Sequence, residues 1–163
     1  TRNEEGELGW YPLDELMQAG VAVGIGADGA ACNNNLDAWM EMRLAGLLAK
    51  LRKGPARFSA QQALNRCTIE GARVLHLEQE IGSLEVGKRA DLLIISLNSF
   101  AQTPVVNVVD TLVFASGAQH VRDVMADGKW LVRNRELLGH DADKIMAEAR
   151  NQAKRLRQKA GLA

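Results

Sequence analysis

The sequence has little cysteine, no excess of charge of either sign and no long apolar run. Its two cysteines, Cys32 and Cys67, lie in different predicted elements and form neither a CxxC pair nor a ligand cluster, so we expect reduced thiols in a cytoplasmic protein. Twenty basic and twenty acidic residues cancel, which favours neither nucleic acid nor a membrane as a partner. No apolar stretch approaches the length of a membrane span, and no charged-then-apolar leader is present, so secretion is not expected.

The chain of 163 residues is long enough for one domain, or slightly more, with a real hydrophobic core. Internal repeats and low-complexity tracts are absent from it. Residues 1–6 contain no initiator methionine, and helix or strand periodicity starts only at Leu13. We therefore expect the sequence to begin within a longer protein.

Helix and strand patterns alternate in the first half of the chain. Residues 12–20 predict a short helix closed by a glycine, and residues 21–26 predict a buried strand. Apolar residues then recur at spacings of three and four over residues 36–52, which predicts a longer helix. Ser59 and Gln62 predict a capping box, and Thr68 predicts the cap of another short helix. This order is typical of an α/β architecture with parallel strands.

The second half has a different character. Residues 90–96 predict a buried strand, and residues 121–126 and 129–132 predict a hairpin around an Asp-Gly turn. We expect the region from about residue 82 to 138 to supply strands that pair locally into a sheet. Residues 141–160 predict a helix with apolar residues on one face. Its many basic residues fit a solvated terminal helix better than a nucleic-acid surface, because acids near its start and cations near its end match the helix dipole.

Asp28 is the main candidate for a functional side chain. It follows the predicted strand at residues 21–26, and α/β enzymes place metal ligands or proton acceptors at the carboxyl ends of such strands. The alternative is an ordinary turn or helix-cap aspartate. Cys32 and Asn33 lie close enough in sequence to contact a substrate, although asparagines before a helix more often satisfy the loop backbone. Asn35 is the expected helix cap.

Residues 24–29 also match the dinucleotide-binding fingerprint GxGxxG. That fingerprint requires a helix that starts at the glycines, and an acidic residue about 20 positions further on at the end of a second strand. Here the helical pattern starts only at Leu36, and residues 46–53 contain neither an acid nor a strand pattern. A dinucleotide-binding module is therefore the weaker interpretation.

Three segments together resemble the amidohydrolase superfamily. Within it they are similar to the aminohydrolase and chlorohydrolase group, which includes methylthioadenosine/S-adenosylhomocysteine deaminases, guanine deaminase and triazine hydrolases. The segments are Gly-Ala-Asp-Gly at residues 26–29 with Asn33, Asn34 and residues 41–43 behind it; the run from Ile81 to Leu92; and residues 121–124 leading to Asp127-Gly128-Lys129. Their order fits the carboxyl-terminal third of that family.

The resemblance implies a (β/α)8 barrel with a divalent metal at its carboxyl-terminal face, zinc or alternatively iron, and a small β-sandwich. Residues 1–80 would then be the last part of the barrel with its final β/α unit, residues 81–140 part of the sandwich, and residues 141–163 a terminal helix. Asp28 would be one metal ligand and the proton acceptor. The histidine ligands of such enzymes would lie outside this sequence, since His76, His120 and His140 form no His-x-His pair and are expected at the surface or an interface.

The function implied by this resemblance is hydrolysis of a carbon–nitrogen bond in a cyclic amidine such as a purine or triazine ring. A metal lowers the pKa of bound water from about 15.7 to about 7, and a neighbouring carboxylate can pass its proton to the leaving amine. This fragment alone is expected to be inactive and to form homo-oligomers through exposed apolar surface. The alternative is a non-catalytic domain that oligomerises in the same way.

Glu41 and Arg43 are expected to form a structural ion pair.

Overall fold

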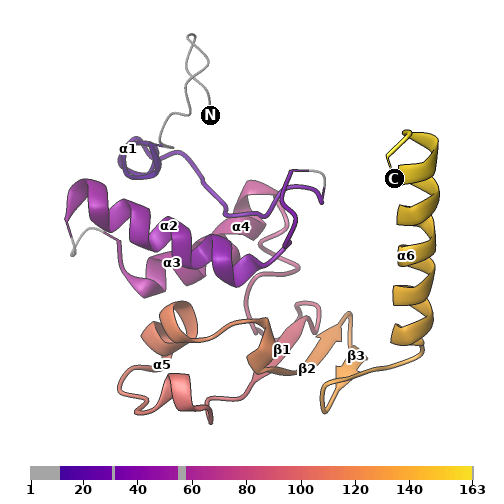
Figure 1. The fold of residues 1–163 in the computed structure, drawn as a ribbon. Helices are drawn as coiled ribbons and strands as arrows, with labels where there is room; N and C mark the ends of the chain where they lie inside the picture. Colours follow the sequence, from indigo (N-terminus) through magenta and orange to yellow (C-terminus); the bar gives the residue numbers. More distant parts are fainter. Residues whose placement is uncertain (1–11, 31, 55–57, 163) are drawn as a thin grey trace.

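The computed structural model describes residues 12–30, 32–54 and 58–162. The opening residues 1–6, on which one expectation rests, lie outside these ranges. Figure 1 shows the helices of the first half of the chain gathered on one side of an antiparallel sheet, with the long last helix, α6 (Ala142–Lys159), standing apart. The helices of the first half are α1 (Leu13–Gln18), α2 (Ala38–Lys53), α3 (Ala60–Cys67) and α4 (Ile69–Val74).

The start of α2 differs from the prediction. Asp37, not Asn35, is the N-cap, and its Oδ1 accepts from the amides of Trp39 at 2.9 Å and Met40 at 3.4 Å. Leu36 has a φ of +49°, which lies outside the right-handed helical region and delays the helix to Ala38. Leu36 therefore fits the apolar spacing of the predicted helix but belongs to the loop that precedes it.

The capping box of α3 is confirmed. The amide of Gln62 donates to Ser59 Oγ at 3.1 Å, and the Ser59 amide donates to Gln62 Oε1 at 2.8 Å. Thr68 is the N-cap residue of α4, as predicted, but its hydroxyl donates to the Leu64 carbonyl at 2.8 Å and makes no cap hydrogen bond.

The hydrophobic core lies among α1, α2 and α3 and the helical segment at residues 108–115. Phe58 is its largest buried side chain, with 1% of its surface exposed. The other members of this core are smaller; they are Leu13, Val23, Met42, Ala60, Ala63 and Val113. One contiguous cluster of this kind makes the helical part a single packed unit.

The strand predicted at residues 21–26 is not formed. The segment is extended, but in the described ranges it has no paired strand beside it. Its backbone is bound to the last turn of α3 instead: the Ile25 amide donates to the Arg66 carbonyl at 3.1 Å, and Arg66 Nη1 donates to the Val23 carbonyl at 3.3 Å. A parallel strand forms only when its neighbours are present, because all of its ladder hydrogen bonds are made to other strands.

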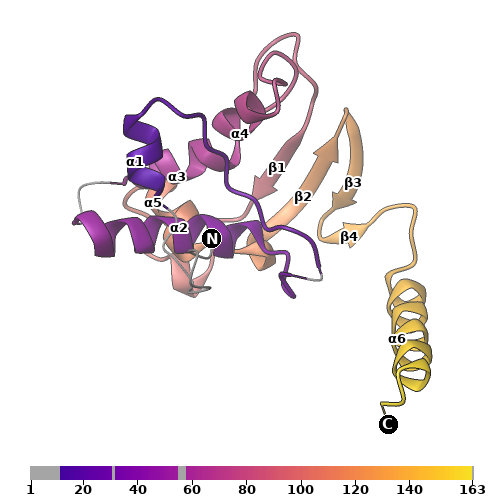
Figure 2. The ribbon, with the colours of Figure 1, turned by 90° about the horizontal axis from the view of Figure 1, so that it is seen from above.

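The sheet contains β1 (Leu92–Ile95), β2 (Val121–Ala126), β3 (Lys129–Arg133) and β4 (Glu136–Leu137), all antiparallel and in that order (Figure 2). The predicted hairpin is confirmed. Asp127 and Gly128 have φ values of +49° and +74°, the left-handed pair that a two-residue hairpin turn requires. The Asp127 amide also donates to Asp91 Oδ1 at 2.6 Å, which ties the turn to the start of β1.

The region from about residue 82 to 138 supplies the strands of the sheet as predicted, but residues 100–120 within it are not strands. This stretch forms short helical turns: η1 (Phe100–Gln102), α5 (Val108–Asp110), η2 (Thr111–Ala115) and η3 (Ala118–His120). His120 is buried, not at the surface, and its Nδ1 accepts from the Gly117 amide at 3.0 Å. Its ring therefore closes the turn that leads into β2.

Gly82 holds the connection between α4 and the sheet close to the helices. Its φ is +91°, and a Cβ atom there would lie 2.8 Å from Ala72 Cβ and 2.9 Å from Ile69 Cα. Only glycine fits this position, because the backbone conformation and the space both exclude a side chain.

The carboxyl-terminal helix α6 (Ala142–Lys159) forms as predicted, with Asp141 as its N-cap. All of its residues are exposed. No helix within the described ranges combines the length and apolarity needed to cross a membrane.

Candidate functional site

Asp28 lies on an exposed loop between the extended segment and α2. Its φ is +59°, and its Oδ1 accepts from the Gly29 amide at 2.7 Å. The backbone then turns tightly, since the amides of Cys32 and Asn33 both donate to the Gly29 carbonyl at 2.9 Å. The carboxylate is thus exposed to solvent immediately before a hydrogen-bonded turn.

Asn33 organises the second half of this loop. Its Oδ1 accepts from the amides of Asn35 at 3.1 Å and Leu36 at 3.4 Å, and its Nδ2 donates to Glu41 Oε1 at 2.6 Å. Both ends of the amide are therefore used to fix the loop to the first turn of α2. Cys32 is exposed beside it.

Arg43 does not form the ion pair with Glu41 that the sequence suggested. Its Nε donates to the Val113 carbonyl at 3.2 Å and its Nη2 to the Ser116 carbonyl. One turn earlier, Trp39 Nε1 donates to the Leu112 carbonyl at 3.1 Å. Two side chains four residues apart on α2 thus bind carbonyl groups of the η2 segment, and they hold α2 and the preceding loop in place.

The dinucleotide interpretation lacks its required helix. The helix after the glycines begins at Ala38, so no helix amino terminus lies at residues 24–29. Gly24 serves packing instead: a Cβ atom there would lie 3.2 Å from Gly71 Cα. This glycine allows the extended segment to approach α4 closely.

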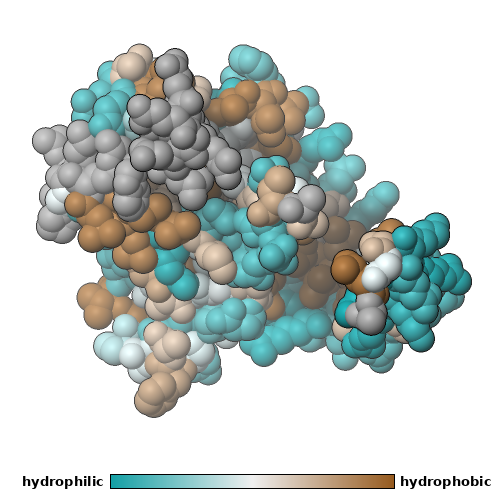
Figure 3. All heavy atoms as spheres, turned by 45° about the horizontal axis from the view of Figure 1, so that its top comes forward, coloured by the Kyte–Doolittle hydropathy of each residue, from teal (hydrophilic) through white to brown (hydrophobic). Residues whose placement is uncertain are grey.

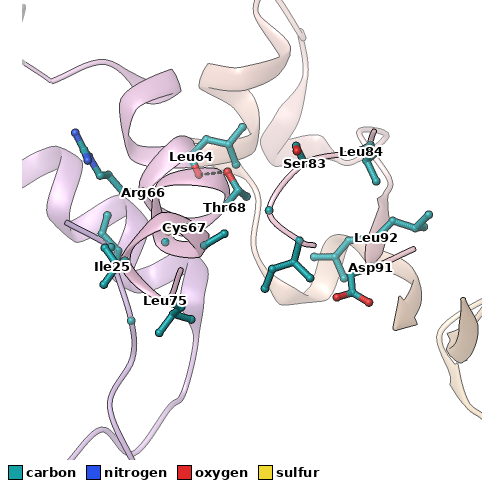
Figure 4. A pocket seen from close by; sticks show the side chains of 18 of the residues that line it. Ile25, Leu64, Arg66, Cys67, Thr68, Leu75, Ser83, Leu84, Asp91 and Leu92 are labelled. Carbon is teal, nitrogen blue, oxygen red and sulfur yellow. Dashed lines mark hydrogen bonds between the residues drawn. The ribbon is translucent and has the colours of Figure 1, made fainter. Parts of the chain in front are cut away.

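A cavity of about 840 Å³ separates the helical part from the sheet. Figure 4 shows Ile25, Cys67 and Leu75 on one side of it and Ser83, Leu84 and Leu92 on the other. Its lining is mainly apolar and includes Gly24 and Gly26, whereas Asp28, Cys32 and Asn33 are not part of it. The extended segment therefore contributes to the cavity through residues 24–26, whereas the candidate site residues follow that segment and lie outside the cavity.

The two cysteines differ in their surroundings. Burial raises the pKa of the Cys67 thiol to about 11, so it stays protonated at neutral pH. Cys32 is exposed on the Asp28 loop. Both are free thiols, as the sequence predicted.

The residues described here do not by themselves make a metal site. A catalytic zinc ion takes three protein ligands and a water, whereas no group of three or more His, Cys, Asp or Glu side chains comes together within the described ranges. Asp28 offers one accessible carboxylate, which fits a single ligand of a larger set.

A profile of the amidohydrolase family matches residues 1–131, so the chain belongs to the amidohydrolase family. The mixture of helices and strands, together with the likeness to solved members, places it in the α/β class.

Among curated relatives, a 5'-deoxyadenosine deaminase from Methanobrevibacter smithii is 40% identical over 152 residues, covering 92% of this chain and 35% of that protein. A 5-methylthioadenosine/S-adenosylhomocysteine deaminase from Desulforudis audaxviator is 42% identical over 149 residues, covering 91% of this chain and 35% of that protein. The chain therefore spans about a third of the length of the curated relatives it matches.

Solved structures of a deaminase and of a chlorohydrolase are also similar to this chain. A zinc-bound adenosine deaminase from Xanthomonas campestris has a TM-score of 0.88 and 38% identity, covering 92% of this chain and 34% of that one. A zinc-bound atrazine chlorohydrolase from Arthrobacter aurescens has a TM-score of 0.76 and 28% identity, covering 86% of this chain and 31% of that one.

Proposed function

We propose that this chain is the carboxyl-terminal third of a cytoplasmic hydrolase that removes the amino group from an adenosine-like purine. Water supplies the oxygen of the product, the exocyclic carbon–nitrogen bond breaks, and ammonia leaves. The observation that carries the proposal is the match over about nine-tenths of the chain to deaminases named for adenosine-type substrates. The triazine-type relative is less similar, at 28% identity, so a triazine ring is the second candidate substrate.

Asp28 is proposed as one metal ligand and as the group that accepts a proton during hydrolysis. Its exposed carboxylate, next to a hydrogen-bonded turn, suits both roles. Zinc is the proposed metal, with iron as the alternative, because the two solved relatives described above hold zinc. Cys32 and Asn33 are proposed to contact the substrate from the same loop.

The remaining ligands are proposed to lie outside these 163 residues. Residues 1–80 would complete a (β/α)8 barrel, and residues 81–140 would form part of a β-sandwich. The isolated chain is then expected to release no ammonia, to bind zinc weakly and to form oligomers. The competing hypothesis is a non-catalytic domain, and it is favoured if the gene encodes no His-x-His segment upstream of residue 1.

Asp28→Asn in the protein at its full natural length tests the proposal. We expect ammonia release from adenosine and 5'-deoxyadenosine to fall about 10²- to 10⁴-fold, together with a lower zinc content. Asp37→Asn is the matched control: it makes the same chemical change in the same loop, and asparagine also caps helices well, so activity should persist. Equal activity of the Asp28→Asn and unmodified proteins would refute the role of Asp28. A full-length protein that deaminates no purine would refute the function.

A further inference from the structure

Helix α6 carries an apolar stripe along its whole length. At 100° per residue its apolar side chains fall on one side of the helix. Ile145, Met146 and Leu156 are 53%, 45% and 66% exposed. The stripe, called here the α6 stripe, consists of these three residues with Ala142, Ala149, Ala153 and Ala160. In Figure 3 the helix is hydrophilic over most of the face in view, with hydrophobic atoms gathered at one side.

The rest of the described chain does not cover this stripe. Figures 1 and 2 both show α6 standing apart from the sheet and from the other helices. Residues 133–162 are exposed throughout. An amphipathic helix gains little stability from propensity alone, so an uncovered stripe of this length points to a partner.

The charges of α6 indicate which partner fits. Residues 141–149 contain three acids and one base, whereas residues 150–159 contain five bases and no acid. A parallel copy would place like charges side by side along the helix. An antiparallel copy would place the acidic end of each helix against the basic end of the other.

We infer that α6 pairs antiparallel with α6 of a second copy of this chain, around a twofold axis near residue 151. In this register Ala149 faces the second copy's Ala153, and Met146 faces its Leu156. The alanines at the centre let the helices approach closely, while the larger side chains pack on either side. A twofold pair is closed, because the same surface is used by both copies.

The helix dipole also favours acids at the start and bases at the end, so charge alone would not require a partner. The helix dipole explains the order of the charges, but it does not explain why apolar side chains such as Leu156 are exposed along one side of α6. Pairing with a second copy explains both observations. The remaining competitor is cover by another part of the same protein.

Leu156→Glu and Gln158→Glu form a matched pair for the test. Each adds one carboxylate to α6, the first on the stripe and the second on the opposite side of the helix. In sedimentation equilibrium of the full-length protein, we expect the Leu156→Glu variant to dimerise at least about tenfold more weakly, and the Gln158→Glu variant to match the unmodified protein. A monomeric unmodified protein, or equal weakening by both changes, overturns the inference. A Leu156→Glu variant with unchanged mass and a lower unfolding midpoint also overturns it, because the stripe is then covered within one protein.

Cysteine cross-linking tests the orientation. Ala149→Cys and Ala153→Cys proteins, each with Cys32→Ser to remove the exposed native thiol, are oxidised separately and as a mixture. An antiparallel pair predicts that the mixed 149–153 disulfide forms in preference to either self-disulfide. A parallel pair, which overturns the proposed arrangement, predicts that each variant cross-links with itself and that the mixture adds nothing.

Discussion

The core around Phe58 and the loop that carries Asp28 obtain their contacts in different ways. Phe58 is enclosed by side chains of the same chain, and α2 is bound to the η2 segment through Arg43 and Trp39. The Asp28 loop is fixed by its own short-range hydrogen bonds, and the segment before it has no paired strand among the described residues. The part that maintains the fold is therefore held together by contacts between distant parts of the chain, whereas the loop of the proposed site is held by local contacts alone.

Removing the centre of the core should have the largest effect. Phe58→Ala is expected to lower the free energy of unfolding by about 3–5 kcal/mol, through lost burial and the cavity that remains. Urea unfolding followed by circular dichroism measures it. Phe100→Ala is the control, since Phe100 is 100% exposed, and it should change stability by less than about 0.5 kcal/mol. Similar losses in both variants would contradict the assignment of the core.

Cutting the link between α2 and η2 should have the next largest effect. Arg43→Met keeps much of the side-chain length but leaves the carbonyls of Val113 and Ser116 without this donor. We expect a loss of about 2–3 kcal/mol in the same unfolding experiment. Arg150→Met on exposed α6 should be nearly neutral by comparison. If the two variants unfold alike, Arg43 does not anchor α2.

Asp123 in β2 should make the stability of the sheet depend on pH. The Asn134 amide, at 2.7 Å from Oδ1, and then Arg122 hold the pKa of this carboxyl below its usual range. A lowered folded-state pKa means that the stabilisation is present above the unfolded-state value of about 3.9 and is lost as pH falls through the folded-state value. Asp123→Asn should thus lower the melting temperature at pH 7, with a difference that shrinks below about pH 4. A pH-independent difference would exclude the charge as its cause.

The reactivities of the two thiols compare the exposed Asp28 loop, which carries Cys32, with the partly buried end of α3, which carries Cys67. This comparison requires no substitution. A thiol with a pKa of about 11 holds about one thiolate in a thousand at pH 8, so Cys67 should react with iodoacetamide at least about tenfold more slowly than Cys32. Mass spectrometry of partially alkylated protein gives both rates, and urea should abolish the difference. Equal rates in the native protein would show that Cys67 is accessible.

Much of the fold followed from local sequence signals. The capping box at Ser59, the Asp127-Gly128 turn and α6 were predictable, because each depends on residues within a few positions of one another. The strand at residues 21–26 was not, since its pairing depends on residues remote in sequence. The same holds for Arg43, whose carbonyl partners lie about 70 positions away.

The candidate site was predictable only to the level of one loop. Sequence reasoning selected Asp28, Cys32 and Asn33 from one turn, and the structure keeps them on one loop with Asn33 as its organising residue. The role of Asn33 in fixing that loop had a visible signal, an amide shortly before a helix with an acid in its first turn. No sequence signal indicated a cluster of metal ligands around Asp28, and the described residues contain no such cluster.

Gly82 limits how this molecule can diverge. Replacing Ala72 with glycine would relieve only one of the two close contacts, because the other atom is Ile69 Cα, which every residue possesses. No paired substitution of side chains could then admit a larger residue at position 82. The junction between helices and sheet should remain fixed during evolution even where both partners around it drift.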